Sequence, residues 1–177
     1  MATFDVPGAL PDAYRVMRLL YLMAPAYLAN MTPPFVRFWH GWNRPICERW
    51  LGSHKTVVGA ASGILVAMAT AGVQRAIAWE GSLMPYDRWP LVGLLLGIGA
   101  IGGDALKSFA KRRIGIAPGQ RWIPFDQLDF VVGALAFVAA WADLSWADVG
   151  EVLVVSVAGD IVVNQVAYRL GIRETSW

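Results

Sequence analysis

The sequence is poor in charged residues, histidine and cysteine. Only 16% of its 177 residues are charged, two are histidine, and Cys47 is the single cysteine. One cysteine excludes an internal disulfide framework and a thiolate metal site, because the latter needs several ligands. The net charge of +2 is too small to favour nucleic acid as a partner. The N-terminus lacks a basic stretch before an apolar core and a small-residue cleavage site, so we expect no removable secretory signal.

What the sequence has in excess is apolar residues. They make up 56% of the chain, and the mean hydropathy is +0.47, which is typical of a membrane protein. A bilayer core needs roughly 20 apolar residues per helix. Five segments approach this length, at residues 13–30, 56–78, 90–109, 128–142 and 149–170. We predict an all-α polytopic membrane protein with five transmembrane helices in one bundle, forming a single domain over residues 1–177.

The distribution of Lys and Arg predicts how the chain is oriented. Basic residues follow the first, third and fifth segments: Arg37, Arg44, Arg49 and Lys55; Lys111, Arg112, Arg113 and Arg121; Arg169 and Arg173. Cytoplasmic connections carry such an excess, so we expect the N-terminus outside and the C-terminus in the cytoplasm. The opposite connections carry Glu80, Asp87, Asp143 and Asp148. Arg15 and Arg18 fit this orientation poorly, and we expect them to reach the lipid headgroups.

Small residues gather in the third segment, in the stretch GLLLGIGAIGG. Gly93 and Gly97 are four residues apart, as are Gly99 and Gly103, and such pairs let helix backbones approach closely within a membrane. We therefore expect the third segment to be central in the bundle, although the pairs are also compatible with a packing face of no functional meaning.

Aspartates at the ends of apolar segments need an explanation, because a charge near the bilayer centre costs a few kcal/mol. Asp104 is followed by Lys107, Ser108 and Lys111 at offsets that place all four on one stripe of a helix, near its cytoplasmic end. This stripe predicts a polar surface on a helix that is otherwise apolar.

Asp126 and Asp129 share the first turn of the fourth segment. Asp126 can cap this helix and Asp129 can benefit from its dipole, which is the plain structural interpretation. Two acids here and Asp104 on a neighbouring helix would repel one another unless a cation lies between them. Oxygen ligands without clustered His or Cys favour Mg²⁺, so Asp104, Asp126 and Asp129 are the predicted metal ligands.

The stretch LGSHKTVVG opens the second segment. It is not a Walker A loop, but it places Gly52, Ser53, Lys55 and Thr56 at a helix N-terminus, where free amides and a lysine can hold an anion. His54 beside them is a candidate ligand or base, or simply a solvated polar residue.

Asp160 and Asn164 share a face of the fifth segment. We expect them to hydrogen-bond to neighbouring helices, with the alternative that they line a cleft for lipid headgroups.

Several stretches together resemble the CDP-archaeol synthases, relatives of CDP-diacylglycerol synthase. They are PAYLANMTP, NRPI, GSHKTVVG, GDALKSFAKRRIGIAPGQ, DQLDFVVGAL and NQVAYRLGI, in the family's order and spacing, and they cover the chain from Pro25 onward. The chain departs at Ser53 and His54, where archaeal members typically read Gly-Asp-Gly-Lys-Thr. This version of the motif has no acid in the loop and is associated with bacterial relatives, so the resemblance leaves the lipid open.

The resemblance implies a five-span cytidylyltransferase of the cell membrane with its active site facing the cytoplasm. Its substrates would be CTP and an isoprenoid ether lipid phosphate, 2,3-bis-O-geranylgeranyl-sn-glycerol 1-phosphate or a similar lipid, and its cofactor Mg²⁺. The metal-binding acids would be Asp104, Asp126 and Asp129, which are also catalytic together with Lys111. The expected nucleotide-binding residues are Gly52, Lys55, Thr56, Ser108, Lys111 and Arg112.

Other classes of function make different predictions. A cytidylyltransferase for another lipid phosphate, such as phosphatidic acid, would use the same residues. A CDP-alcohol phosphotransferase would need a longer Asp-x-x-Asp-Gly-x-x-Ala-Arg pattern, which the sequence lacks. A small transporter subunit would use the acids for ion passage and would have no reason to bind CTP.

Overall fold

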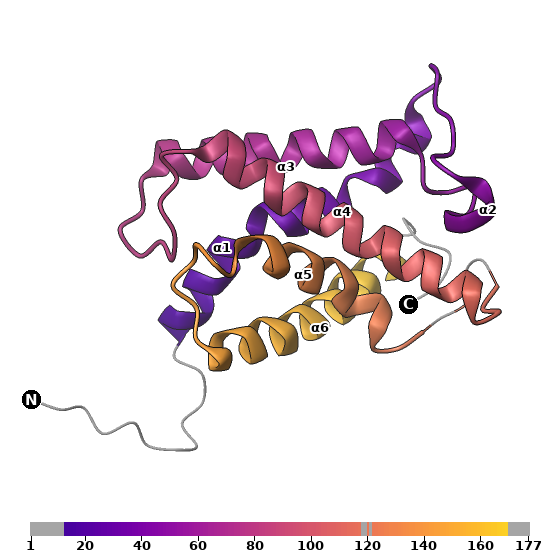
Figure 1. The fold of residues 1–177 in the computed structure, drawn as a ribbon. Helices are drawn as coiled ribbons and strands as arrows, with labels where there is room; N and C mark the ends of the chain where they lie inside the picture. Colours follow the sequence, from indigo (N-terminus) through magenta and orange to yellow (C-terminus); the bar gives the residue numbers. More distant parts are fainter. Residues whose placement is uncertain (1–12, 118–119, 121, 170–177) are drawn as a thin grey trace, which may run out of the picture.

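The computed structural model describes residues 13–117, 120 and 122–169, without the side chains of residues 37, 38 and 167. Over this part the chain forms helices and no strand, apart from one isolated bridge between Pro45 and Thr56. The elements are α1 (Ala13–Met31), the 3₁₀ helix η1 (Pro33–Phe38), α2 (Glu48–Leu51), α3 (Val57–Ile77), α4 (Trp89–Arg113), α5 (Phe125–Val138) and α6 (Trp146–Arg169) (Figure 1). The expectation of an all-α fold is confirmed.

Each predicted apolar segment overlaps one of the five long helices. Two of the described helices, α3 and α4, are long and apolar enough to cross a membrane by length and composition. Passage of all five through the bilayer, and the orientation of the chain, stay predictions. Arg121 and Arg173, used to predict that orientation, lie outside the described residues.

Local sequence signals account for where these helices begin and end. Thr56 caps α3, because its hydroxyl oxygen accepts a hydrogen bond from the Gly59 amide at 3.1 Å. Ala78 ends α3 in the left-handed conformation. Pro90 stands in the first turn of α4, where the missing amide hydrogen has no helical acceptor.

Helix α4 is the central element, as the glycine spacing predicts. It packs against α1, α2, α3 and α5, whereas α6 packs against α5 and α1 at the side of the bundle (Figure 1). The approach of α4 to α5 is especially close, since a Cβ atom on Gly103 would overlap the carbonyl oxygen of Asp129. A Cβ on Gly133 would likewise overlap the carbonyl oxygen of Gly99. These glycines therefore fix how near the acids of α5 come to those of α4.

Candidate active site

A cluster of three lysines and three aspartates lies where the last turns of α4 meet the first turns of α5. Asp104, Lys107 and Lys111 share one side of α4, as their spacing predicts, and both lysines contact acids of α5. Asp126 and Asp129 come from the start of α5, and Lys55 from the connection between α2 and α3. Three segments far apart in the sequence thus meet in one charged cluster.

Lys107 is the centre of this cluster. Its Nζ lies 3.2 Å from Asp104 Oδ1, 3.3 Å from Asp126 Oδ1 and 2.7 Å from Asp129 Oδ2. The side chains are shielded from solvent, with 15% of Lys107 and 5% of Asp129 exposed. All three predicted acids therefore converge on one positively charged nitrogen.

The other two lysines sit at the edges of the cluster. Lys55 Nζ forms an ion pair with Asp104 Oδ2. Lys111 Nζ lies 3.0 Å from Asp126 Oδ1 and also donates a hydrogen bond to the carbonyl oxygen of Gln120. Three ammonium groups face three carboxylates, so the cluster is electrically balanced by its own side chains.

Backbone amides hold the two acids of α5 in place. The Trp122 amide donates to Asp126 Oδ2 at 2.6 Å, and the Phe130 amide donates to Asp129 Oδ1 at 2.7 Å. Asp126 is thus bonded to the turn before α5, but the N-cap residue is Pro124, so the alternative that Asp126 itself caps the helix is wrong.

The donor set partly fits a divalent cation. Three carboxylates that converge on one point are hard oxygen donors of the kind that Mg²⁺ prefers. In the part of the chain that the structure describes, however, no three acidic, His or Cys side chains stand in a metal-ligating arrangement. The position that the acids share is held by Lys107 Nζ. Lys107 has to give up some of these contacts for the same acids to hold a metal, because two cations repel at that distance.

Four of the predicted nucleotide-binding residues have contacts other than with the charged groups of this cluster. Gly52 ends α2 with a φ of 88°, and Thr56 uses its hydroxyl to cap α3. Ser108 donates to the carbonyl oxygen of Asp104 in its own helix at 2.9 Å. Arg112 donates to the carbonyl oxygen of Ile116 and lines a cavity beside α2. The prediction that these residues bind a nucleotide is not tested by these contacts.

Lys107 was not among the predicted site residues, although it is the residue that all three acids share. Its signal is in the sequence, since it follows Asp104 by three positions on the polar stripe. Spacing places it on the same face as Asp104, but only the packing of α5 brings Asp126 and Asp129 to it.

The remaining polar candidates lie elsewhere. His54 is exposed in the connection between α2 and α3. Asn164 Nδ2 donates to Asp160 Oδ2 at 2.9 Å within α6. This bond joins two residues of one helix, and hydrogen bonds from this pair to neighbouring helices stay a prediction.

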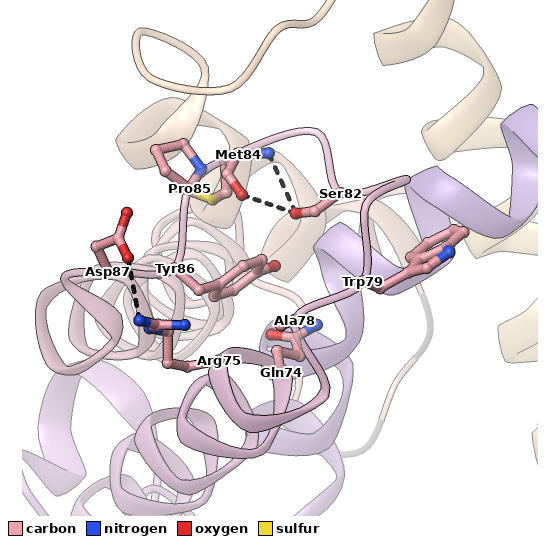
Figure 2. Close-up of a pocket in the computed structure, with 9 residues that line it drawn as sticks. All are labelled: Gln74, Arg75, Ala78, Trp79, Ser82, Met84, Pro85, Tyr86 and Asp87. Atoms are coloured by element: carbon pink, nitrogen blue, oxygen red, sulfur yellow. Dashed lines mark hydrogen bonds and ion pairs between the residues drawn. The ribbon is translucent and has the colours of Figure 1, made fainter.

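A small cavity of about 220 Å³ lies near the α3–α4 connection (Figure 2). The exposed pair of Arg75 and Asp87 stands at its side, with 3.4 Å between Nη2 and Oδ1. Tyr86 is buried beside Gln74, and burial raises the pKa of its hydroxyl, which therefore stays protonated. The aspartates of the cluster are not among the residues that line this cavity.

The fold and the cluster define a class: a helical protein with long apolar helices and a charged site between α4 and α5. Residues 14–177 match the family model described as "CarS-like: CDP-archaeol synthase", and the chain belongs to this family.

Curated relatives agree with this assignment. CDP-archaeol synthase of Methanococcus aeolicus is 33% identical over 93% of this chain and 98% of its own. Those of Sulfurisphaera tokodaii and Methanopyrus kandleri are 34% and 35% identical, over 95% and 89% of this chain and 100% and 91% of theirs.

A solved structure is similar over most of the chain. It is described as an intramembrane enzyme for archaeal membrane lipid biosynthesis, with a TM-score of 0.71 and 26% identity over 84% of this chain and 94% of its own. The prediction of family membership is confirmed.

Proposed function

We propose that the protein is a multi-pass membrane cytidylyltransferase that uses CTP to activate a lipid phosphate, with its active site at the cytoplasmic surface. Relatives that share about a third of its residues over nearly its whole length are named CDP-archaeol synthases, which favours an isoprenoid ether lipid phosphate as the substrate. The observation that carries the proposal is the convergence of Asp104, Asp126 and Asp129 on one point.

In the proposed reaction, an oxygen of the lipid phosphate attacks the α-phosphorus of CTP. A new P–O–P bond forms, the bond between the α- and β-phosphates breaks, and its electrons leave with pyrophosphate. A phosphate monoester is largely dianionic near neutral pH, because its second pKa is about 6. It therefore needs no general base, and the exposed His54 is not required for the chemistry.

The protein has to position two anions and neutralise the charge that develops on the leaving group. We propose that Asp104, Asp126 and Asp129 would hold Mg²⁺, which would supply positive charge to the phosphate oxygens of the substrates. The amides of Trp122 and Phe130 fix the carboxylates of α5. Lys55, Lys111 and Arg112 then supply positive charge toward the pyrophosphate.

The test is transfer of labelled cytidylyl from CTP to lipid by the purified protein in detergent, with pyrophosphate measured as the second product. We expect Asp126→Asn and Asp129→Asn each to lower turnover at least 100-fold. Removing a charged group that acts at the reacting phosphates raises the activation free energy by about 3 kcal/mol or more. Asp87→Asn is the matched control, since this side chain is 77% exposed in the connection between α3 and α4. Most of the activity remaining in either cluster variant would refute the assignment.

A lipid panel decides the substrate. Glycerol-1-phosphate and glycerol-3-phosphate lipids, each with ether and ester chains, are compared at equal concentration with the wild-type protein. We expect the glycerol-1-phosphate ether lipid to be preferred. Preference for phosphatidic acid would support the cytidylyltransferase activity but change the assigned lipid substrate. If labelled pyrophosphate does not exchange into CTP with any of the lipids, the cytidylyltransferase activity is excluded for both kinds of substrate.

A further inference from the structure

The connection between α1 and α3, residues 32–56, exposes large apolar side chains at one end of the bundle (Figure 1). Five of them are 48–61% exposed: Phe35, Trp39, Trp42, Ile46 and Trp50. Lipid chains would cover the exposed apolar side chains of α3 and α4, which are long enough to cross a membrane. The elements of this connection, η1 and α2, are far too short to cross one. Its exposed rings therefore need another explanation.

Backbone hydrogen bonds tie this connection to the start of α3. The Ile46 amide donates to the Lys55 carbonyl oxygen at 2.8 Å, and the Val57 amide donates to the Arg44 carbonyl oxygen at 3.0 Å. The side chain of Lys55 in turn pairs with Asp104. The connection thus has a defined place, at the same end of the bundle as the charged cluster.

Two tryptophans flank a turn of the connection. Trp39 Nε1 donates a hydrogen bond to the Trp42 carbonyl oxygen at 3.2 Å, and a Cβ atom on Gly41 would overlap the Trp39 ring. The turn thus satisfies the polar group of Trp39, but Trp39 is still 59% exposed and Trp42 is 60% exposed. The turn therefore presents two aromatic side chains to whatever surrounds this end of the bundle.

We propose that the α1–α3 connection lies in the headgroup layer of the membrane leaflet on the side of the charged cluster. Trp39 and Trp42 then sit among the headgroups, and Arg44 binds the phosphate of an anionic lipid. The proposal rests on the proposed membrane location and on none of the proposed catalysis.

The backbone and the side chains of the connection agree on this depth. Residues 39–47 have irregular backbone, whose unpaired amides and carbonyl groups are not tolerated in contact with lipid chains. Water is an equally poor surrounding for several exposed indole rings. The headgroup layer suits both, because it is hydrated and because tryptophan collects there in membrane proteins.

Charge favours an anionic lipid as the partner. Residues 32–56 hold four Lys and Arg but a single acid, Glu48. Arg44 is exposed, and within the described ranges no carboxylate oxygen lies within 4 Å of its guanidinium group. Basic residues at the edge of a bilayer are attracted to anionic lipids, and a guanidinium fork donates two parallel hydrogen bonds to a phosphate.

The test is fluorine NMR of the full chain labelled with 5-fluorotryptophan, in nanodiscs of phosphatidylcholine and phosphatidylglycerol. Trp39→Phe and Trp42→Phe assign their resonances among the nine tryptophans. Two paramagnetic probes are then compared: a lipid with a nitroxide at the headgroup end of its chain, and a gadolinium chelate that stays in water. We expect the nitroxide lipid to broaden both resonances more strongly than the chelate does.

Stronger broadening by the chelate would overturn the proposal, since it would place the connection in water. Protection from both probes would also overturn it and would assign the rings to a protein–protein contact. If the nitroxide lipid broadens no tryptophan resonance at all, the membrane location itself fails, whether or not the protein transfers a cytidylyl group. Elution from a sizing column and the unfolding temperature report whether a variant is folded, and Trp→Tyr variants assign the resonances where Trp→Phe variants are not.

The role of Arg44 is tested with two nitroxide lipids that differ only in the headgroup, phosphatidylglycerol and phosphatidylcholine. In wild type we expect the anionic lipid to broaden the Trp42 resonance about fivefold more, which corresponds to about 1 kcal/mol from one arginine at an anionic surface. Arg44→Gln should lose this preference. Arg75→Gln is the matched control and should keep it, because Arg75 lies in the last turn of α3, at the opposite end of that helix. Equal broadening in wild type, or a preference that survives in Arg44→Gln, would overturn the assignment of Arg44.

Discussion

Replacing Lys107 by Met tests whether the charged cluster is held together by its central cation. Methionine has a similar length and keeps the apolar contacts of the stem, but it removes the charge. Asp104 would keep Lys55 and Asp126 would keep Lys111, whereas Asp129 would keep only the hydrogen bond from the Phe130 amide. The free-energy cost therefore falls mainly on Asp129.

The size of this effect follows from burial. Removing one partner of a buried ion pair costs about 3–5 kcal/mol. Asp129 is only 5% exposed, but Lys107 is 15% exposed and the other two acids retain a lysine. We therefore expect the lower end, about 3 kcal/mol, which lowers the Tm of a chain of this size by roughly 6–12 °C.

Thermal unfolding in detergent measures the effect, and a double-mutant cycle assigns it. Asp129→Asn in the Lys107→Met background removes the orphaned charge, so we expect the double variant to recover at least half of the lost Tm. Arg75→Met, which breaks an exposed pair, should change the Tm by only a few degrees or less. A Lys107→Met protein as stable as wild type, or no recovery in the double variant, would contradict the reasoning.

Two further predictions concern the approach of the helices and the metal. Gly103→Ala should lower the stability by about 1–3 kcal/mol, as overpacking does, and also reduce turnover, because the new Cβ would overlap the Asp129 carbonyl oxygen. Gly102→Ala is its control, since a Cβ there meets no atom within 4 Å, and equal losses in the two variants would argue against a close helix contact. Treatment with a chelator should abolish cytidylyl transfer, and added Mg²⁺ should restore it; full activity after chelation would exclude the proposed metal role of Asp104, Asp126 and Asp129.

The sequence alone determined which segments become helices and which residues carry the charge. Long apolar stretches leave the backbone few alternatives to a helix in a membrane, and Thr56 and Pro90 mark helix starts by local chemistry. The stripe that begins at Asp104 follows from helical periodicity. These signals act over a few residues, so they can be read along the chain.

Which charges meet depends on how the helices pack. The acids of α5 reach Lys107 because Gly103 and Gly133 let two helix backbones touch, and the depth of that approach depends on both helices together. Periodicity likewise does not reveal that Lys111 contacts Asp126 while its neighbour Arg112 lines the cavity beside α2. Ion pairs depend on distances of a few ångströms between segments far apart in the chain, and those distances are set by packing.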